Sequence, residues 1–111
     1  MDPEIKTWLF DVLQSIAEIE SYFDGKPKRF DEYIADIKTK RAVERDIEII
    51  GEASKKIDEE FKATHIHIEW KKMAGARDKL IHDYFGIDYD IVWDIIQNKI
   101  PDLDHFLNEL L

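Results

Sequence analysis

The fold class is decided by residues 2–23, DPEIKTWLFDVLQSIAEIESYF. Apolar side chains recur there at intervals of three and four residues: Ile5, Trp8, Leu9, Val12, Leu13, Ile16, Ile19 and Phe23. This spacing places them on one face of an α-helix, whereas a strand would require strict alternation. Asp2 and Pro3 suit the N-cap and the first helical position, and Gly25 and Pro27 end the pattern. We therefore expect a long amphipathic helix here.

The next part of the chain predicts a short helix and a second long one. Residues 28–38 contain enough apolar side chains for a short helix. From Ala42 to about residue 62 the apolar period of a helix returns, with Thr39 as its expected cap. Gly51 lies in the middle of this pattern, where it costs about 1 kcal/mol relative to alanine. We interpret Gly51 as a packing residue that allows the backbone of a neighbouring helix to come close.

The remaining chain predicts two further helices. One begins at Trp70 and is expected to end at Gly86, which suits a left-handed C-cap. The other opens at Asp88, kinks or restarts at Pro101, and carries its apolar face to the last residue. No segment shows the alternation of a strand. The expected fold is all-α, an up-and-down bundle of four main helices plus a short helix, in a single domain of residues 1–111.

Composition excludes several classes of protein. The 111 residues are 44 % hydrophobic and 37 % charged, with no cysteine, which argues against disorder, a disulfide scaffold, thiolate metal sites and a cysteine nucleophile. The start of the chain is acidic, unlike a signal peptide, and no apolar run is long enough to span a membrane. We therefore expect a cytoplasmic protein with no membrane partner.

The net charge of −9 argues against a protein that coats nucleic acid without specificity. Two segments are nevertheless basic. Residues 26–45 hold seven basic and four acidic side chains, and residues 64–82 hold four basic and two acidic side chains. A polyanion would therefore have to bind locally. The side chains that could contact it are Lys38, Lys40, Arg41, Arg45, Lys71, Lys72 and Lys79, although each is individually expected to be a solvated helix residue.

Arg77 interrupts the apolar face of the third expected helix. At 100° per residue from Trp70, Arg77 falls at about 340°, between apolar positions on either side. A guanidinium cannot lose its charge, so burial there requires a carboxylate, a phosphate or a second subunit. Within one chain the alternatives are an arginine that reaches the edge of the bundle or one that pairs with a buried acid.

His82 follows Asp78 by four residues, a spacing at which a carboxylate can orient an imidazole and raise its pKa. A surface contact of little consequence is the simpler interpretation of an isolated pair. Positions 77 and 82 differ by about 140° around an ideal helix. They can serve one site only if the helix loosens before Gly86, or if the site is shared across a two-fold axis.

Residues 77–84 form the motif R-x4-H-x-Y, with Arg77, His82 and Tyr84 at its defined positions. Together with its setting, AGARDKLIHDYFGID, and with the segment RAVERDIEIIGEA at residues 41–53, it resembles the HepT-like branch of the HEPN superfamily. The resemblance extends over nearly the whole chain. One position departs from the pattern, since the residue after the arginine is commonly Asn in that group and is Asp78 here.

The resemblance implies a helical homodimer that is a metal-independent ribonuclease and needs no cofactor. Arg77 and His82 would be its catalytic residues and Asp78 would support His82. The family acts as the toxin of a toxin–antitoxin pair, whose partner is a cognate minimal nucleotidyltransferase antitoxin. That partner adds AMP units to the motif tyrosine, here Tyr84, and the added phosphates would block the RNA substrate.

Other interpretations stay open at this stage. The chain could be a non-catalytic HEPN module that binds nucleotide or serves a nucleotidyltransferase as partner, or a helical adaptor if Arg77 is paired inside a monomer core. A metal site at His65, His67 and Glu69 is a poor zinc candidate, because a fourth ligand is not nearby. The three tryptophans are expected to be core residues: Trp8, Trp70 and Trp93.

Overall fold

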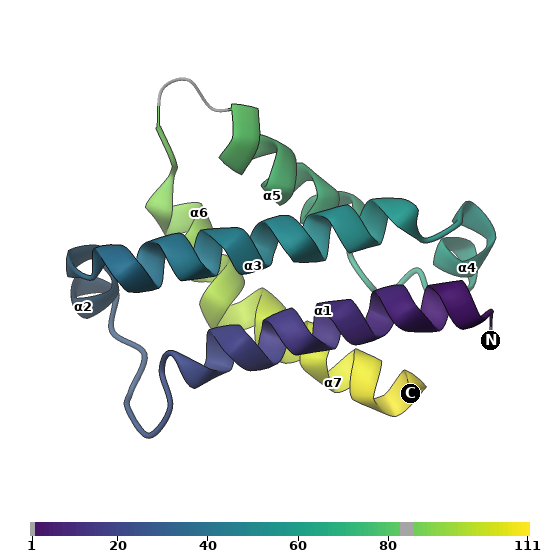
Figure 1. Ribbon diagram of the computed structural model, residues 1–111, viewed down its shortest axis with the longest axis horizontal. Coiled ribbons are helices and arrows are strands. Elements are labelled where there is room, and N and C mark those ends of the chain that lie inside the picture. Colours follow the sequence, from purple (N-terminus) through teal and green to yellow (C-terminus); the bar gives the residue numbers. More distant parts are fainter. Residues whose placement is uncertain (1, 83–85) are drawn as a thin grey trace.

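The computed structural model describes residues 2–82 and 86–111, and of Lys79, Ile81 and His82 it describes the backbone only. Figure 1 shows the long helices α1 (Pro3–Ser21) and α3 (Ile37–Lys56) lying side by side, with the short helix α2 (Phe30–Ala35) between them in sequence. The expected first helix is confirmed. Asp2 caps it by accepting a hydrogen bond from the Glu4 amide at 2.8 Å, and its expected apolar face is buried.

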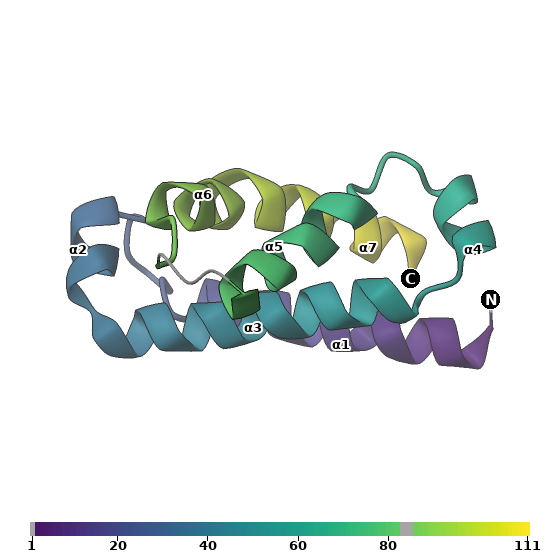
Figure 2. The ribbon, with the colours of Figure 1, turned by 90° about the horizontal axis from the view of Figure 1, so that it is seen from above.

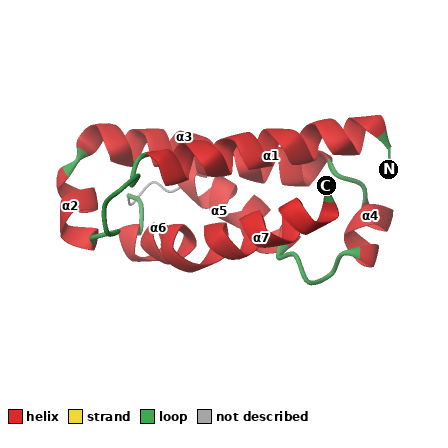
Figure 3. Ribbon diagram, turned by 90° about the horizontal axis from the view of Figure 1, so that it is seen from below, coloured by secondary structure: helices red, strands yellow, loops and turns green. Residues whose placement is uncertain are grey.

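Helices α5 (Trp70–His82), α6 (Tyr89–Asp94) and α7 (Ile100–Leu110) form the other half of the bundle. In Figure 2, α1 and α3 make one layer, α6 and α7 make the other, and α5 runs diagonally across α3. Successive main helices alternate in direction, so the predicted all-α up-and-down bundle is confirmed. Figure 3 shows short connections and, within the part of the chain that is described, no strand. None of the described helices has both the length and the apolar composition needed to cross a membrane.

The second long helix has different ends from those expected. Asp36, not Thr39, is its N-cap, because the Asp36 carboxylate accepts hydrogen bonds from the Thr39 amide at 3.1 Å and the Thr39 hydroxyl at 2.8 Å. The helix ends at Lys56 instead of near residue 62. Asp58 then caps a separate short helix, α4 (Glu59–Thr64), by accepting from the Phe61 amide at 2.8 Å. The cap at Asp58 thus ends one helix and begins another, although the apolar spacing of the sequence continues across it.

The fourth main helix is continuous from Tyr89 to Leu110 but includes a π-helical turn, η1 (Ile95–Lys99). Asp88 caps its start, as expected. In the π register the donor to the Ile96 carbonyl would be the amide of residue 101, and Pro101 has none. Lys28 donates to this carbonyl instead, at 3.3 Å, and also to Glu20 at 3.2 Å. The α-helical register resumes at Ile100, so the kink or restart expected at Pro101 takes the form of a change of register inside a continuous helix. Lys28 links the connection after α1 to η1.

The core lies between the two layers and includes Trp70, while Trp8 and Trp93 are partly buried against it. The carboxyl group of Asp46 on α3 is also buried, and this residue is only 1 % exposed. The Tyr22 hydroxyl donates to its Oδ2 at 2.9 Å. Burial, followed by hydrogen bonding with Glu18, raises the pKa of Asp46 to about 7. This carboxyl therefore holds its proton more strongly than an exposed aspartate does.

Candidate active site

Gly51 of α3 contacts α5, the helix that carries Arg77. A Cβ atom at this position would lie 2.9 Å from the carbonyl oxygen of Met73 and 3.1 Å from Cγ of Arg77, and closer still to Cβ of Arg77. These distances are shorter than normal contacts allow, so only glycine permits α5 to approach α3 this closely. The prediction that Gly51 is a packing residue is confirmed, and the residue that packs on it is the motif arginine itself.

The guanidinium of Arg77 reaches from this contact to the edge of the bundle. Its side chain is 24 % exposed, with Nη2 3.6 Å from Glu52 and Nη1 3.2 Å from Asp78. Both carboxylates are about half exposed, so Arg77 is not paired with a buried acid in a monomer core. Its Nε is buried and has no hydrogen-bond partner among the described residues. Burial of Arg77 therefore does not by itself require a second subunit, and the structure does not favour the adaptor interpretation.

Asp78 connects two cations from different helices. Its Oδ1 accepts hydrogen bonds from Lys55 of α3 at 2.5 Å and from Arg77 at 3.2 Å. The Lys55 hydrogen bond and, to a smaller extent, that of Arg77 hold the pKa of Asp78 below its usual range. Sequence reasoning missed both Lys55 and Glu52. The spacing of Lys55 was a usable signal, because a position four residues beyond a helix-contact glycine lies on the same face of the helix, whereas Glu52, about 100° around the helix, gave no such signal.

Of the other two motif residues, the structure describes the backbone of His82 and no part of Tyr84. The backbone of α5 is helical through position 82, so the helix does not loosen between the two motif positions. Around this regular helix, positions 77 and 82 differ by about 140°. The predicted pairing of Asp78 with His82 involves a side chain outside the described residues, and Tyr84 lies outside them altogether, so both stay predictions. Gly86 has the positive φ, 102°, expected of a left-handed residue.

The basic side chains named from the sequence do not gather around Arg77. Lys40 lies over the ring of Tyr89 at 5.0 Å, and Arg41 pairs with Glu44 at 3.0 Å, about 15 Å along α3 from Gly51. Lys72 pairs with Glu69. The others that are described, Lys38, Arg45 and Lys71, are exposed, and the side chain of Lys79 is outside the described residues. Among the described side chains, these residues therefore do not form a continuous basic track.

No three described His, Asp or Glu side chains lie close enough to hold a metal ion. His65 stacks on Phe61 with ring centres 4.2 Å apart, and His67 packs edge-on against Phe106. Glu69 is engaged by Lys72 and Lys99, each at 3.3 Å. The three residues that the sequence offered as a metal site are thus directed to different neighbours.

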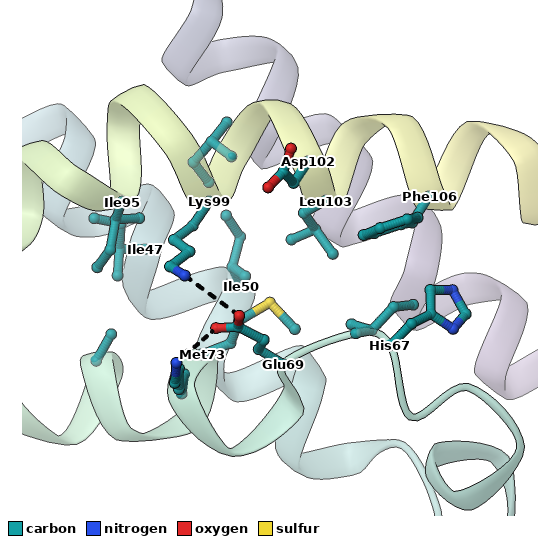
Figure 4. A pocket seen from close by; sticks show the side chains of 14 residues that line it. Ile47, Ile50, His67, Glu69, Met73, Ile95, Lys99, Asp102, Leu103 and Phe106 are labelled. Carbon is teal, nitrogen blue, oxygen red and sulfur yellow. Dashed lines mark hydrogen bonds and ion pairs between the residues drawn. The ribbon is translucent and has the colours of Figure 1, made fainter.

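A cavity among the described residues lies on the other side of α5. It has a volume of about 100 Å³ between α3, α5 and the η1–α7 helix, and Figure 4 shows its mostly apolar lining, in which Lys99 pairs with Glu69. Arg77 and Asp78 do not line it. We therefore locate the candidate site at the exposed edge where α5 meets α3, outside this cavity.

Comparison with known proteins connects these features to one family. The profile of the family described as ribonuclease HepT-like matches residues 12–110. A Methanocaldococcus jannaschii protein named "Putative RNase MJ0127" is 44 % identical over 98 residues, 88 % of this chain and 79 % of its own length. A Thermococcus cleftensis protein named "Probable ribonuclease HepT" is 44 % identical over 98 residues, covering 88 % of this chain and 87 % of itself. No solved structure matches.

Proposed function

The chain belongs to the ribonuclease HepT-like family, and from this we propose that it is a metal-independent endoribonuclease that acts in the cytoplasm as the toxin of a type VII HepT/MNT toxin–antitoxin system. Membership of a ribonuclease family makes endoribonuclease its enzyme class. The finer parts of the proposal concern the residues that cut RNA, the homodimer and the antitoxin partner.

The observation that carries the proposal is the state of Arg77. Three quarters of this side chain is buried, yet its guanidinium ends at the surface beside two carboxylates that are themselves half exposed. Gly51 lies against its Cβ and Cγ and its Nε is buried, so much of the side chain is already held in place before any substrate binds. A fixed, permanently charged fork at an accessible edge is well suited to a phosphate whose negative charge grows in the transition state.

His82 is proposed as the group that transfers protons. Cleavage of RNA without a metal ion needs a base that removes the proton from a 2′-hydroxyl. The 2′-oxygen then attacks phosphorus, the bond to the 5′-oxygen breaks, and an acid supplies a proton to that leaving oxygen. An imidazole can perform either role near neutral pH, and Asp78 is proposed to support it.

The regular helix supports a homodimer as the active form. Because α5 stays helical through position 82, Arg77 and His82 project from positions about 140° apart, which is unfavourable for one site in one chain. Two copies related by a two-fold axis would bring the Arg77 of one beside the His82 of the other. Such a dimer would also place two imidazoles at the cleavage site, one as base and one as acid.

Regulation is proposed to act on Tyr84, two residues beyond His82. A cognate minimal nucleotidyltransferase would transfer AMP from ATP to the Tyr84 hydroxyl, with pyrophosphate as the leaving group. The attached phosphate is an anion close to the motif, so it would compete with RNA for Arg77. Added negative charge on a protein at −9 would further oppose the approach of RNA.

The test is RNA cleavage by the purified protein in the presence of a chelator. We expect Arg77→Ala and His82→Ala to lose roughly two to four orders of magnitude in rate. Matched controls are Arg29→Ala and His105→Ala, whose side chains are 61 % and 68 % exposed and pair only with nearby surface acids. We expect both controls to cleave at the wild-type rate and all four variants to keep the helical circular-dichroism spectrum.

Three results would contradict the proposal. Undiminished cleavage by His82→Ala would remove His82 from the mechanism, and cleavage that disappears with the chelator would show dependence on a metal ion. An absence of cleavage by the unmodified wild-type protein, together with measurable nucleotide binding, would favour a non-catalytic HEPN module that serves a nucleotidyltransferase.

A further inference from the structure

We propose that Lys55 and Arg77 together bind a phosphate of the RNA backbone, and that the Asp78 carboxylate occupies this phosphate site when RNA is absent. The inference rests on the proposed ribonuclease function and adds a substrate-contacting residue, Lys55, from a helix outside the motif. It also gives Asp78 a second role besides the support of His82, that of a built-in competitor for the substrate.

The geometry is that of two cations converging on one anion. Lys55 reaches Asp78 from α3, and Arg77 reaches the same Oδ1 atom from within α5. A phosphate oxygen accepts the same charge-assisted hydrogen bonds from lysine and arginine that a carboxylate oxygen accepts. The point at which Lys55 and Arg77 meet is therefore suited to phosphate, and Asp78 marks that point in the RNA-free protein.

The site is open enough for a polymer to reach. The side chains of Lys55 and Asp78 are 41 % and 47 % exposed, so an RNA strand passing along the edge of α5 can approach them. Ion pairs this exposed contribute little to stability, because water screens them and both side chains lose freedom. Exchange of the Asp78 carboxylate for a phosphate therefore costs the folded protein little stability.

The balance of charges at this site predicts that its two carboxylates limit its affinity for RNA. Lys55 and Arg77 face two carboxylates, those of Asp78 and Glu52, so the group has no net charge in the absence of RNA. Removal of the Asp78 charge leaves one uncompensated cation and should strengthen RNA binding. Removal of the Lys55 charge should weaken it, since one phosphate contact is lost.

The alternative role of Lys55 is structural: it could hold Asp78 in place and never touch RNA. The two roles differ in salt dependence. Each phosphate contact adds about 0.7 to the slope of log K against log salt for a single strand, whereas a residue that only positions others leaves that slope unchanged. The neighbouring Lys56 is a matched control, because its Nζ lies over the Trp8 ring at 4.4 Å, on the α1 side.

The experiment measures binding of a fluorescent, single-stranded 2′-O-methyl RNA of mixed sequence over a range of salt concentrations. All proteins carry His82→Ala, so that neither cleavage nor an effect of Asp78 on His82 enters the result. We expect Lys55→Gln to weaken binding roughly tenfold at low salt and to reduce the slope by about 0.7. Lys56→Gln should match the parent, Lys55→Arg should restore binding, and Asp78→Asn should bind more tightly.

The outcomes separate this inference from the proposed function. If the parent binds RNA but Lys55→Gln and Lys56→Gln have equal slopes, Lys55 is not a phosphate ligand, while the ribonuclease proposal stands. Weaker binding by Asp78→Asn would show that Asp78 does not compete with the substrate. If the parent binds no RNA, both the inference and the RNA substrate of the proposed function are wrong.

Discussion

Replacement of Gly51 by alanine tests the contact on which the candidate site rests. The added methyl group would meet the Met73 carbonyl oxygen at 2.9 Å and Arg77 Cγ at 3.1 Å. A backbone carbonyl within α5 cannot move alone, so the whole helix must shift away from α3. Gly75, in α5 itself, is the control, because a Cβ atom there would have no neighbouring atom within 4 Å.

Two terms decide the magnitude. Alanine is favoured over glycine in a helix by about 1 kcal/mol, and this gain applies equally to Gly51→Ala and Gly75→Ala. Overpacking at Gly51 costs about 1–3 kcal/mol in addition. The difference in unfolding free energy between the two variants removes the common gain and leaves the packing cost. We therefore expect Gly75→Ala to be more stable than Gly51→Ala by about 1–3 kcal/mol.

The assay is urea unfolding followed by circular dichroism, with all proteins at one concentration because the stability of the proposed dimer would depend on it. The same variants are then compared in RNA cleavage. A displaced α5 moves Arg77, and a shift of about 1 Å can cost roughly a hundredfold in rate. Equal unfolding free energies for the two variants would refute the close contact. Unimpaired cleavage by Gly51→Ala would refute its role in placing Arg77.

Three other perturbations follow from the structure. With the pKa of Asp46 at about 7 when folded and about 3.9 when unfolded, the folded state binds more protons in that range and loses stability as pH rises through it. Asp46→Asn cannot lose stability in this way. The difference in unfolding free energy between the variant and the wild type should therefore change in the variant's favour as pH rises from ~4 to ~7, by at most about 1.4 kcal/mol per pH unit. A difference that does not vary with pH would contradict the raised pKa. Lys28→Met removes the donor to the Ile96 carbonyl in the π turn and should lower the unfolding free energy by about 1–2 kcal/mol. An unchanged unfolding free energy would show that water replaces the Lys28 ammonium as the donor. Tyr84→Phe should stay active but escape neutralisation by the co-expressed nucleotidyltransferase, and mass spectrometry that finds AMP on another residue would assign the modification elsewhere.

The sequence alone was sufficient for those features that depend on neighbours along the chain. The first helix and the start of α6 were predicted correctly because a cap residue and an apolar period of three and four residues act within a few turns. The interpretation of Gly51 was also local in origin, since a glycine inside a strong helix pattern needs a reason to be there. The motif Arg77 to Tyr84 and its family resemblance were likewise readable from the order of the residues.

Competition between local signals limited the prediction of α3. Thr39 is a good cap in isolation, but Asp36 accepts hydrogen bonds from both its amide and its hydroxyl, so the helix begins earlier. The apolar period continued past Lys56 because Ile57 is buried and Phe61 of α4 packs against the core. Asp58 ended the helix nonetheless, since its cap lets the chain change direction without leaving amides unsatisfied.

The tertiary structure alone decided which residues surround the motif. Periodicity placed Arg77 on an apolar face, but only the diagonal crossing of α5 over α3 sets its Cβ on Gly51 and sends its guanidinium to the edge. The same crossing brings Lys55 to Asp78 across 23 residues of sequence. The physical reason is that a helix fixes the direction of each side chain relative to its own axis, while the partner that it meets depends on how two axes cross.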